Sequence, residues 1–159
     1  MKNIENLKQH IVLEIMERLD FFDAFSDYEK ERITRFYTNF YIYEQGEYLI
    51  KEGSRDTSFF ILLSGTVSVT KGVKKLLMAK LDPGDIFGEV TFLTDTQRRT
   101  SNVFADDTVI VIKVDRGMLR QLSPEIREKI KDRVIEKLVK RLDYMNKEMI
   151  RIQITQYSQ

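Results

Sequence analysis

The chain has 159 residues, of which 42% are hydrophobic and 32% are charged, so it suits one compact domain rather than a disordered segment. Lys and Arg number 26 against 25 Asp and Glu, and this formal net charge of +1 argues against a general nucleic-acid binder. The absence of cysteine excludes disulfides, iron–sulfur clusters, thiol catalysis and Cys-ligated zinc, and a single histidine, His10, argues against multi-histidine metal sites and most histidine-dependent hydrolases.

Residues 1–37 are predicted to form N-terminal helices. Charges interrupt the first twenty residues, and no apolar run approaches a signal-peptide core or a membrane span, so a cytoplasmic protein is expected. An apolar stripe with helical spacing consists of Ile4, Leu7, Ile11, Ile15 and Leu19. Ser26 followed by Glu29 has the capping-box pattern that begins a second helix. That helix is expected to place Ile33, Phe36 and Tyr37 on its inner side.

Residues 38–114 contain short β-branched and aromatic runs that are separated by glycine-containing turns. The clearest runs are residues 48–50, 59–63, 66–69, 76–78 and 108–112. Many short strands at this spacing favour an antiparallel sandwich or barrel. Because no helix-length periodic segment separates the runs, a doubly wound parallel sheet is not expected.

Residues 115–159 are predicted to be mainly one long helix. Ser123 is a suitable N-cap, Pro124 suits the first helical position, and the helix is expected to end near Ile152 with a frayed tail at 153–159. An apolar stripe with the 3.5-residue repeat of a coiled-coil seam consists of Ile135, Leu138, Leu142, Met145, Met149 and Ile152. Two interpretations stay open: the stripe packs on the chain's own sheet or N-terminal helices, or it joins two copies in a homodimer.

The segment 87–103 holds the residues best suited to binding chemistry. Gly88 allows close backbone approach to a ligand, and a helix that starts just after it offers N–H groups to an anion. Arg99 can present a planar fork to a phosphate or carboxylate, beside the hydroxyls of Thr100 and Ser101. Near an anion, Glu89 needs donors of its own, which a pair of sugar hydroxyls would supply, so the pattern indicates a ribose phosphate. From residue types alone, a surface ion pair between Glu89 and Arg99 is the alternative.

Four motifs resemble the cyclic nucleotide-binding domain family in order and spacing. They are QGEYLI at 45–50 with Glu52-Gly53, FILLSGTV at 60–67, DPGDIFGE at 82–89 and RTSNV at 99–103. The match covers about residues 22–122. The resemblance implies a mixed α+β fold, in which a jelly-roll-like, antiparallel eight-stranded β-roll is flanked by N-terminal helices and by C-terminal B and C helices. It also implies that residues 87–103 are the family's phosphate-binding cassette.

The resemblance implies a cyclic nucleotide ligand, cAMP or cGMP, and no further cofactor. In this reading Glu89 takes the ribose 2′-hydroxyl, Gly88 contributes backbone and Arg99 pairs with the cyclic phosphate. Thr100 and Ser101 then donate to phosphate or base. The complete set of expected ligand-binding residues is Phe87, Gly88, Glu89, Val90, Arg99, Thr100 and Ser101.

Two details of the cassette bear on this assignment. Arg99 is preferred to Arg98 because it aligns with the family's Arg-small-small-x-Val pattern, and because alternation along an extended segment points only one of them inward. The chain departs from the family where Val90-Thr91-Phe92 replaces the usual Leu-Ala-Leu, so Thr91 is a polar residue in an apolar place.

The sequence therefore predicts a non-enzymatic sensor or regulatory domain whose C-terminal helix moves over the base when ligand binds. Thr100, directly after the arginine, resembles members that respond to cGMP but also suits cAMP, which is preferred as the broader ligand. The alternative is a degenerate domain that serves as a ligand-free dimerisation or protein-interaction module.

A cupin-like metalloenzyme is not expected, because its metal site would need several histidines and the chain has one. Since no helix-turn-helix or kinase signature follows, a stand-alone sensor, a regulatory subunit or a piece of a longer protein is expected, with an unknown effector.

Overall fold

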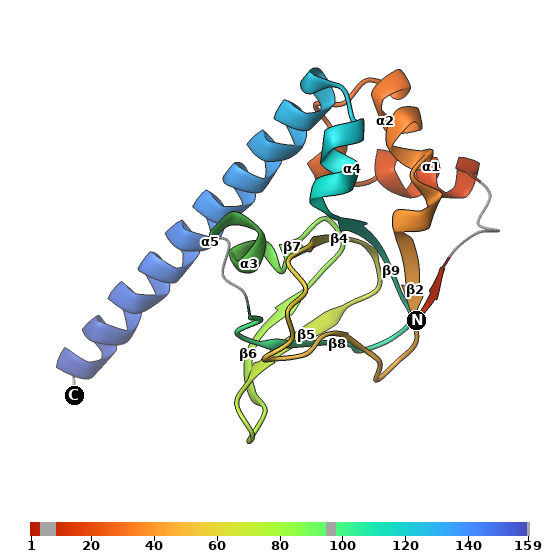
Figure 1. Ribbon diagram of the computed structural model, residues 1–159. Helices are drawn as coiled ribbons and strands as arrows, with labels where there is room; N and C mark the ends of the chain where they lie inside the picture. Colours follow the sequence, from red (N-terminus) through yellow and green to blue (C-terminus); the bar gives the residue numbers. More distant parts are fainter. Residues whose placement is uncertain (4–8, 95–97, 159) are drawn as a thin grey trace.

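The computed structural model describes residues 1–3, 9–94 and 98–158. In this part of the chain the strands form two antiparallel sheets, with the orders β1-β2-β9-β4-β7 and β3-β8-β5-β6 (Figure 1). Strands β2 to β9 are the eight strands of a roll, and the short β1 pairs with β2. The predicted antiparallel eight-stranded roll with flanking helices is therefore confirmed.

The elements follow one another in this order. The strands are β1 (Lys2–Asn3), β2 (Phe40–Tyr43), β3 (Tyr48–Ile50), β4 (Phe59–Ser64), β5 (Val67–Lys71), β6 (Leu76–Leu81), β7 (Ile86–Phe87), β8 (Asn102–Ala105) and β9 (Val109–Val114). The α-helices are α1 (Gln9–Glu17), α2 (Asp27–Thr34), α3 (Glu89–Thr94), α4 (Arg116–Gln121) and α5 (Pro124–Tyr157). Two 3₁₀ turns lie at Asp20–Phe22 and Tyr37–Asn39.

Strand β4 explains how the two cores are arranged. It lies between β9 and β7, and five of its consecutive side chains are buried. Since neighbouring side chains of a strand point to opposite faces, Phe59, Ile61 and Leu63 join a core beneath the helices. Phe60 and Leu62 join a second core inside the roll. A strand that is covered on both faces thus has an uninterrupted apolar sequence.

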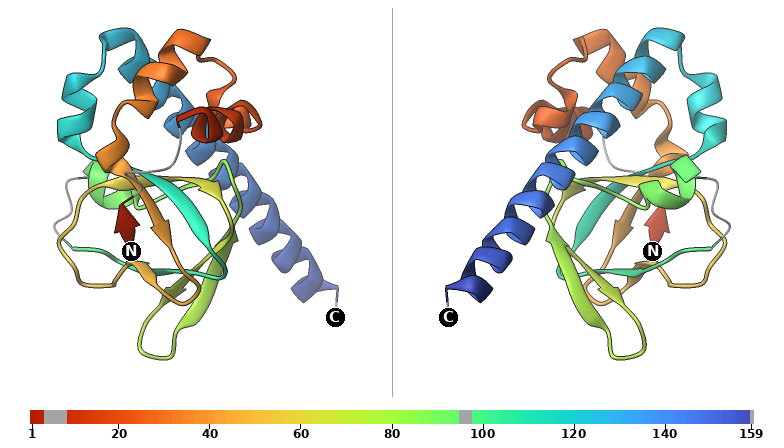
Figure 2. Two further views of the ribbon diagram at one scale, coloured as in Figure 1. Left: turned by 90° about the vertical axis from the view of Figure 1, so that its right-hand side faces the viewer. Right: turned by 90° about the vertical axis from the view of Figure 1, so that its left-hand side faces the viewer.

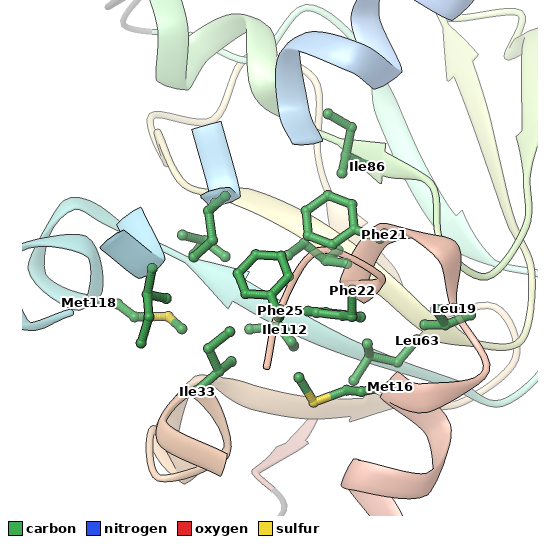
Figure 3. Close-up of a cluster of buried hydrophobic side chains, with 14 of the residues drawn as sticks. Met16, Leu19, Phe21, Phe22, Phe25, Ile33, Leu63, Ile86, Ile112 and Met118 are labelled. Carbon is green, nitrogen blue, oxygen red and sulfur yellow. The ribbon is translucent and has the colours of Figure 1, made fainter. Parts of the chain in front are cut away.

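The core beneath the helices holds the helical bundle against the sheet that contains β4. Figure 3 shows its aromatic centre, where Phe21 and Phe22 meet edge to face with ring centroids 5.0 Å apart. Met16 from α1, Ile33 from α2 and Met118 from α4 surround this centre, and all three are nearly inaccessible to solvent. Three separate helices are thereby fixed on one face of the roll.

The predicted stripe of the first helix is only partly correct. Ile4 and Leu7 lie outside the described residues. Ile11 is 39% exposed, whereas Val12 and Met16 face the core. The physical reason is that α1 ends at Glu17. Leu19 therefore lies in the connection after the helix, and it is buried there and not on the predicted helical face.

The second helix begins as predicted but ends earlier. Ser26 and Glu29 form both hydrogen bonds of a capping box, which confirms this element. Ile33 is buried. Tyr37 is 58% exposed, so its predicted inward position is wrong, because α2 ends at Thr34 and Tyr37 begins a 3₁₀ turn that changes the direction of the chain.

Helix α5 is longer than predicted and only its first half packs on the domain. Its buried residues are Ile126, Ile130 and Val134, and beyond further contacts at Leu138 and Arg141 the helix projects past the roll (Figures 1 and 2). The helix reaches Tyr157, so the predicted frayed tail is wrong.

Most of the predicted seam is more than half exposed, namely Ile135, Leu142, Met145, Met149 and Ile152. Only Leu138 of the seam packs against the core, so intramolecular packing of the whole seam is excluded.

Among the described residues, no helix has the length and apolarity that a membrane span requires.

Candidate functional site

A pocket of about 150 Å³ opens between the sheet β3-β8-β5-β6, the β7–α3 connection and helix α5. Its lining includes every residue that the sequence predicted for the site: Phe87, Gly88, Glu89, Val90, Arg99, Thr100 and Ser101. The other lining residues are Ile50, Val69, Ala79, Leu81, Thr91, Val103 and Arg141. The pocket therefore combines an apolar floor, made by the sheet, with two arginines and a carboxylate at its wall.

Gly88 has a backbone conformation and a position that no other residue fits well. Its φ is +79°, in the region that L-residues with a side chain rarely adopt. A Cβ atom at this position would lie 3.0 Å from Arg99 Nη1 and 3.1 Å from the Ser58 carbonyl oxygen. The glycine thus lets the start of α3 lie directly against the Arg99 guanidinium.

Arg99 is a buried cation, with only 4% of its surface exposed. Its Nη1 donates to the carbonyl oxygen of Gly88 at 2.9 Å and to Thr91 Oγ1, and its Nη2 donates to the carbonyl oxygen of Ser58. Nε is buried and has no hydrogen-bond partner among the described residues. Burial lowers the pKa of the Arg99 guanidinium from its ordinary value, while the charges of Asp56 and Glu89 act in the opposite direction.

Asp56 supplies the counter-charge behind Arg99. Its Oδ2 lies 3.5 Å from Arg99 Nη2 and 3.1 Å from Lys113 Nζ. Burial opposes ionisation of this carboxyl, but hydrogen bonds from Ser58 and the charge of Lys113 outweigh it and keep the pKa of Asp56 below its ordinary value. Asp56 is therefore ionised at neutral pH and pairs with Nη2 of Arg99, whereas Gly88 accepts from Nη1.

Glu89 is the first residue of α3 and is also buried, with 6% exposed surface. Its Oε1 accepts a 2.6 Å hydrogen bond from Arg141 Nη1, and Arg141 Nη2 donates to the carbonyl oxygen of Ile86 at 2.8 Å. Helix α5 is thus fixed to the pocket wall by one guanidinium. The alternative prediction of a surface ion pair between Glu89 and Arg99 is wrong. Both side chains are buried, and each forms its ion pair with another residue.

The two adjacent arginines point in opposite directions, as predicted. Arg98 is exposed and donates to the carbonyl oxygen of Gly53 at 3.0 Å, whereas Arg99 lines the pocket. Thr100 is exposed and Ser101 is half-buried, so both lie at the rim. The cassette segment also includes residues 95–97, which lie outside the described residues.

Sequence reasoning missed four residues that hold this site together: Asp56, Ser58, Thr91 and Arg141. Thr91 had a signal, since its hydroxyl in an apolar place is the group that accepts from Arg99. Asp56 and Ser58 lie in the connection before β4, more than forty positions from Arg99, and nothing in their local pattern distinguishes them from turn residues. Arg141 is one of several basic residues on α5, and only the path of the helix across the pocket singles it out.

Comparison with known proteins shows the family of this chain. The family model described as "Cyclic nucleotide-binding domain" matches residues 42–124. A cAMP-dependent protein kinase regulatory subunit from Debaryomyces hansenii is 41% identical over 86 residues, which are 54% of this chain and 19% of that protein. Human cGMP-dependent protein kinase 2 is 31% identical over 83 residues, which are 50% of this chain and 11% of that protein.

The chain thus spans less than a fifth of the length of these relatives. Among solved structures, a cyclic nucleotide-binding domain from Methylobacillus flagellatus has the same fold, with a TM-score of 0.70 and 23% identity over 89% of this chain and 82% of that one. The family model covers more than half of the chain, and its span contains both Arg99 and Glu89 with the strands that position them. The chain belongs to the cyclic nucleotide-binding domain family.

Proposed function

We propose that this chain is a non-catalytic sensor domain that binds a cyclic nucleotide, with cAMP as the preferred ligand, in the pocket lined by Arg99 and Glu89. The observation that carries this proposal is the burial of the Arg99 guanidinium in the pocket wall, with an Nε donor that no described residue satisfies. A buried donor without a partner costs free energy, and an anion that enters the pocket would offset that cost.

The proposed binding mode uses the two charged groups for two parts of the ligand. The cyclic phosphate lies against Arg99, and the hydroxyls of Thr100 and Ser101 donate to it from the rim. The ribose 2′-hydroxyl donates to Glu89, whose carboxylate has a second oxygen besides the one bound by Arg141. A hydrogen bond to a charged group contributes about 1.5–3 kcal/mol, so each contact is worth roughly a tenfold to a hundredfold change in affinity.

The ligand's base would lie over the apolar part of the pocket. Ile50, Val69, Leu81 and Val103 form this floor. Of the relatives reported above, one is named for cAMP and the other for cGMP, so they support a cyclic nucleotide without deciding the base. Thr100 is compatible with either nucleotide, and we keep cAMP as the preferred ligand and cGMP as its competitor in the test.

Helix α5 is the element that we propose to respond to the ligand. Arg141 joins this helix to Glu89, so a ribose that engages Glu89 acts on the same carboxylate that fixes the helix. Beyond Leu138 the apolar side chains of α5 are exposed, which leaves this half of the helix available for a second copy of the chain or for an effector. Because a ligand shifts a two-state equilibrium only by its differential affinity, a complete shift would require about 5.5 kcal/mol.

A second candidate function, a ligand-free dimerisation module, is favoured by one specific observation. Glu89 and Arg99 already have protein partners, Arg141 and Asp56 respectively, while five residues of the α5 seam are exposed. In that case the pocket would bind no ligand, and the exposed seam of α5 would form the functional interface.

The two candidates are separated by a thermal-shift screen with cAMP, cGMP and cyclic dinucleotides, in parallel with light scattering. The sensor proposal predicts a rise in melting temperature that grows with the logarithm of ligand concentration, because the ligand binds only the native state. No shift with any nucleotide, together with a dimeric mass, would overturn the sensor and support the dimerisation module.

A further inference from the structure

The hairpin formed by residues 71–80, here called the basic hairpin, has an unusual surface for a folded domain. All ten residues are exposed, from Lys71 at the end of β5 through the turn and along β6 to Lys80. Figures 1 and 2 show the tip projecting from the roll, away from α1, α2 and α4. Strand β6 is also the edge of its sheet, so it pairs with β5 alone.

Charge is concentrated in this short segment. It contains Lys71, Lys74, Lys75 and Lys80 and no acidic residue of its own. Two carboxylates of the body lie beside it: Glu52 accepts from the N–H of Gly72, and Asp106 lies 3.9 Å from Lys80 Nζ. The whole chain has 26 basic and 25 acidic residues, so everything outside the basic hairpin has an excess of three acidic residues. The net charge of +1 therefore conceals a strongly positive projection on an otherwise acidic body, and such a surface attracts an anionic partner.

Large apolar side chains are exposed between these lysines. Val73 at the turn is fully exposed, and Leu76, Leu77 and Met78 on β6 are 67%, 53% and 58% exposed. Gly72 in the same turn has open space around it, since no atom lies within 4 Å of the position that a Cβ would take. Lysines on an edge strand protect it from pairing, but they give no reason for four exposed apolar side chains beside them.

We propose that the basic hairpin binds the surface of an anionic lipid bilayer, with its apolar tip inserted at the interface and its lysines at the level of the head groups. Apolar side chains that project from a tip and are flanked by lysines fit a planar interface, which needs no complementary shape. Lysines near an anionic leaflet are attracted in proportion to their number. An acidic protein partner would use the same charges, but it would require a shaped surface for apolar side chains that alternate between the two faces of β6. The proposed binding requires no bound nucleotide, although Ala79 of the hairpin also lines the pocket.

The test is co-sedimentation of the protein, without nucleotide, with vesicles of phosphatidylcholine alone and of phosphatidylcholine mixed with phosphatidylserine. We expect binding only to the vesicles that contain phosphatidylserine, and we expect raised salt to weaken it. The double variant Lys71→Glu and Lys74→Glu should weaken binding by at least about tenfold. The double variant Val73→Ser and Leu76→Ser should weaken it at low salt as well, which a purely electrostatic contact would not show.

The matched control reverses two charges at the opposite end of the molecule, with Arg18→Glu beyond α1 and Arg120→Glu on α4, both exposed. It changes the net charge by the same amount and should leave vesicle binding unchanged. Melting temperatures of all variants verify that each is folded. The proposal is overturned if the wild type does not bind phosphatidylserine vesicles, or if the control loses binding as strongly as the hairpin variant. Binding to an acidic polypeptide without binding to vesicles would also overturn it, in favour of a protein partner.

Discussion

Arg141, near the middle of helix α5, donates a 2.6 Å hydrogen bond to Glu89 at the first residue of α3. The Glu89 side chain is only 8% exposed, so the removal of Arg141 leaves an almost buried carboxylate without its counter-charge. We predict that Arg141→Ala lowers the free energy of unfolding by about 1.5–3 kcal/mol, measured by urea denaturation. Lys140→Ala, at the neighbouring exposed position, is the control and should change stability little. Equal effects of the two substitutions would show that the contact does not stabilise the fold.

Gly88 provides a second prediction, because it has both a positive φ and a close neighbour. Gly88→Ala is expected to cost about 1–2 kcal/mol for the left-handed conformation and also to displace the Arg99 guanidinium. Gly72→Ala is a matched control, with φ +80° but open space around the position. Both variants should lose stability in thermal melts, and only Gly88→Ala should weaken cAMP binding in calorimetry. Unchanged binding in Gly88→Ala would contradict the assigned position of Arg99.

A third prediction concerns the seam of α5. Leu142 is 59% exposed on the stripe, and Tyr144 is 64% exposed away from it. If the stripe joins two copies, Leu142→Asp should convert a dimer into a monomer, while Tyr144→Asp should leave the dimer intact. Sedimentation equilibrium measures both masses. A monomeric wild type, or dissociation of the dimer by both substitutions, would show that the stripe does not join two copies.

A fourth prediction concerns pH and the contact between α2 and α5. Glu29 Oε1 lies 2.5 Å from Lys129 Nζ. Burial would raise the pKa of Glu29, but the hydrogen bonds from Lys129 and Ser26 outweigh it, so the pKa in the folded state is below its ordinary value. The ionised carboxylate therefore stabilises the native state above the unfolded pKa of about 4.3, and this contribution is lost as pH falls through the lower folded pKa.

The difference in melting temperature between the wild type and Glu29→Gln should accordingly be largest near neutral pH and decrease below about pH 4. Glu31→Gln is the control, because Glu31 is half exposed and its partner Arg35 is at 3.5 Å, so its effect should be small at every pH. A constant difference for Glu29→Gln across the pH range would refute the assigned ionisation.

The sequence predicted which residues line the pocket where the determinants are local. Gly88, Glu89 and Arg99 lie within one short segment, and the direction of Arg98 against Arg99 follows from alternation along an extended chain. It missed Ser58 and Arg141 because these residues meet the site across 41 and 52 positions of the chain, and only tertiary packing brings them there. Likewise, Leu19 and Tyr37 were placed on helices that in fact end before them, because spacing alone does not reveal where a short helix stops.

The central claim, that Arg99 binds a cyclic phosphate, is tested most directly by isothermal titration calorimetry with cAMP on the wild type, Arg99→Ala and Arg98→Ala. Arg99→Ala should weaken binding by about tenfold to more than a hundredfold, since it removes a charged hydrogen bond from a buried site. Arg98→Ala should bind as the wild type does, because its side chain is exposed and contacts Gly53. Binding to the wild type that persists at the same affinity in a folded Arg99→Ala protein would contradict the account.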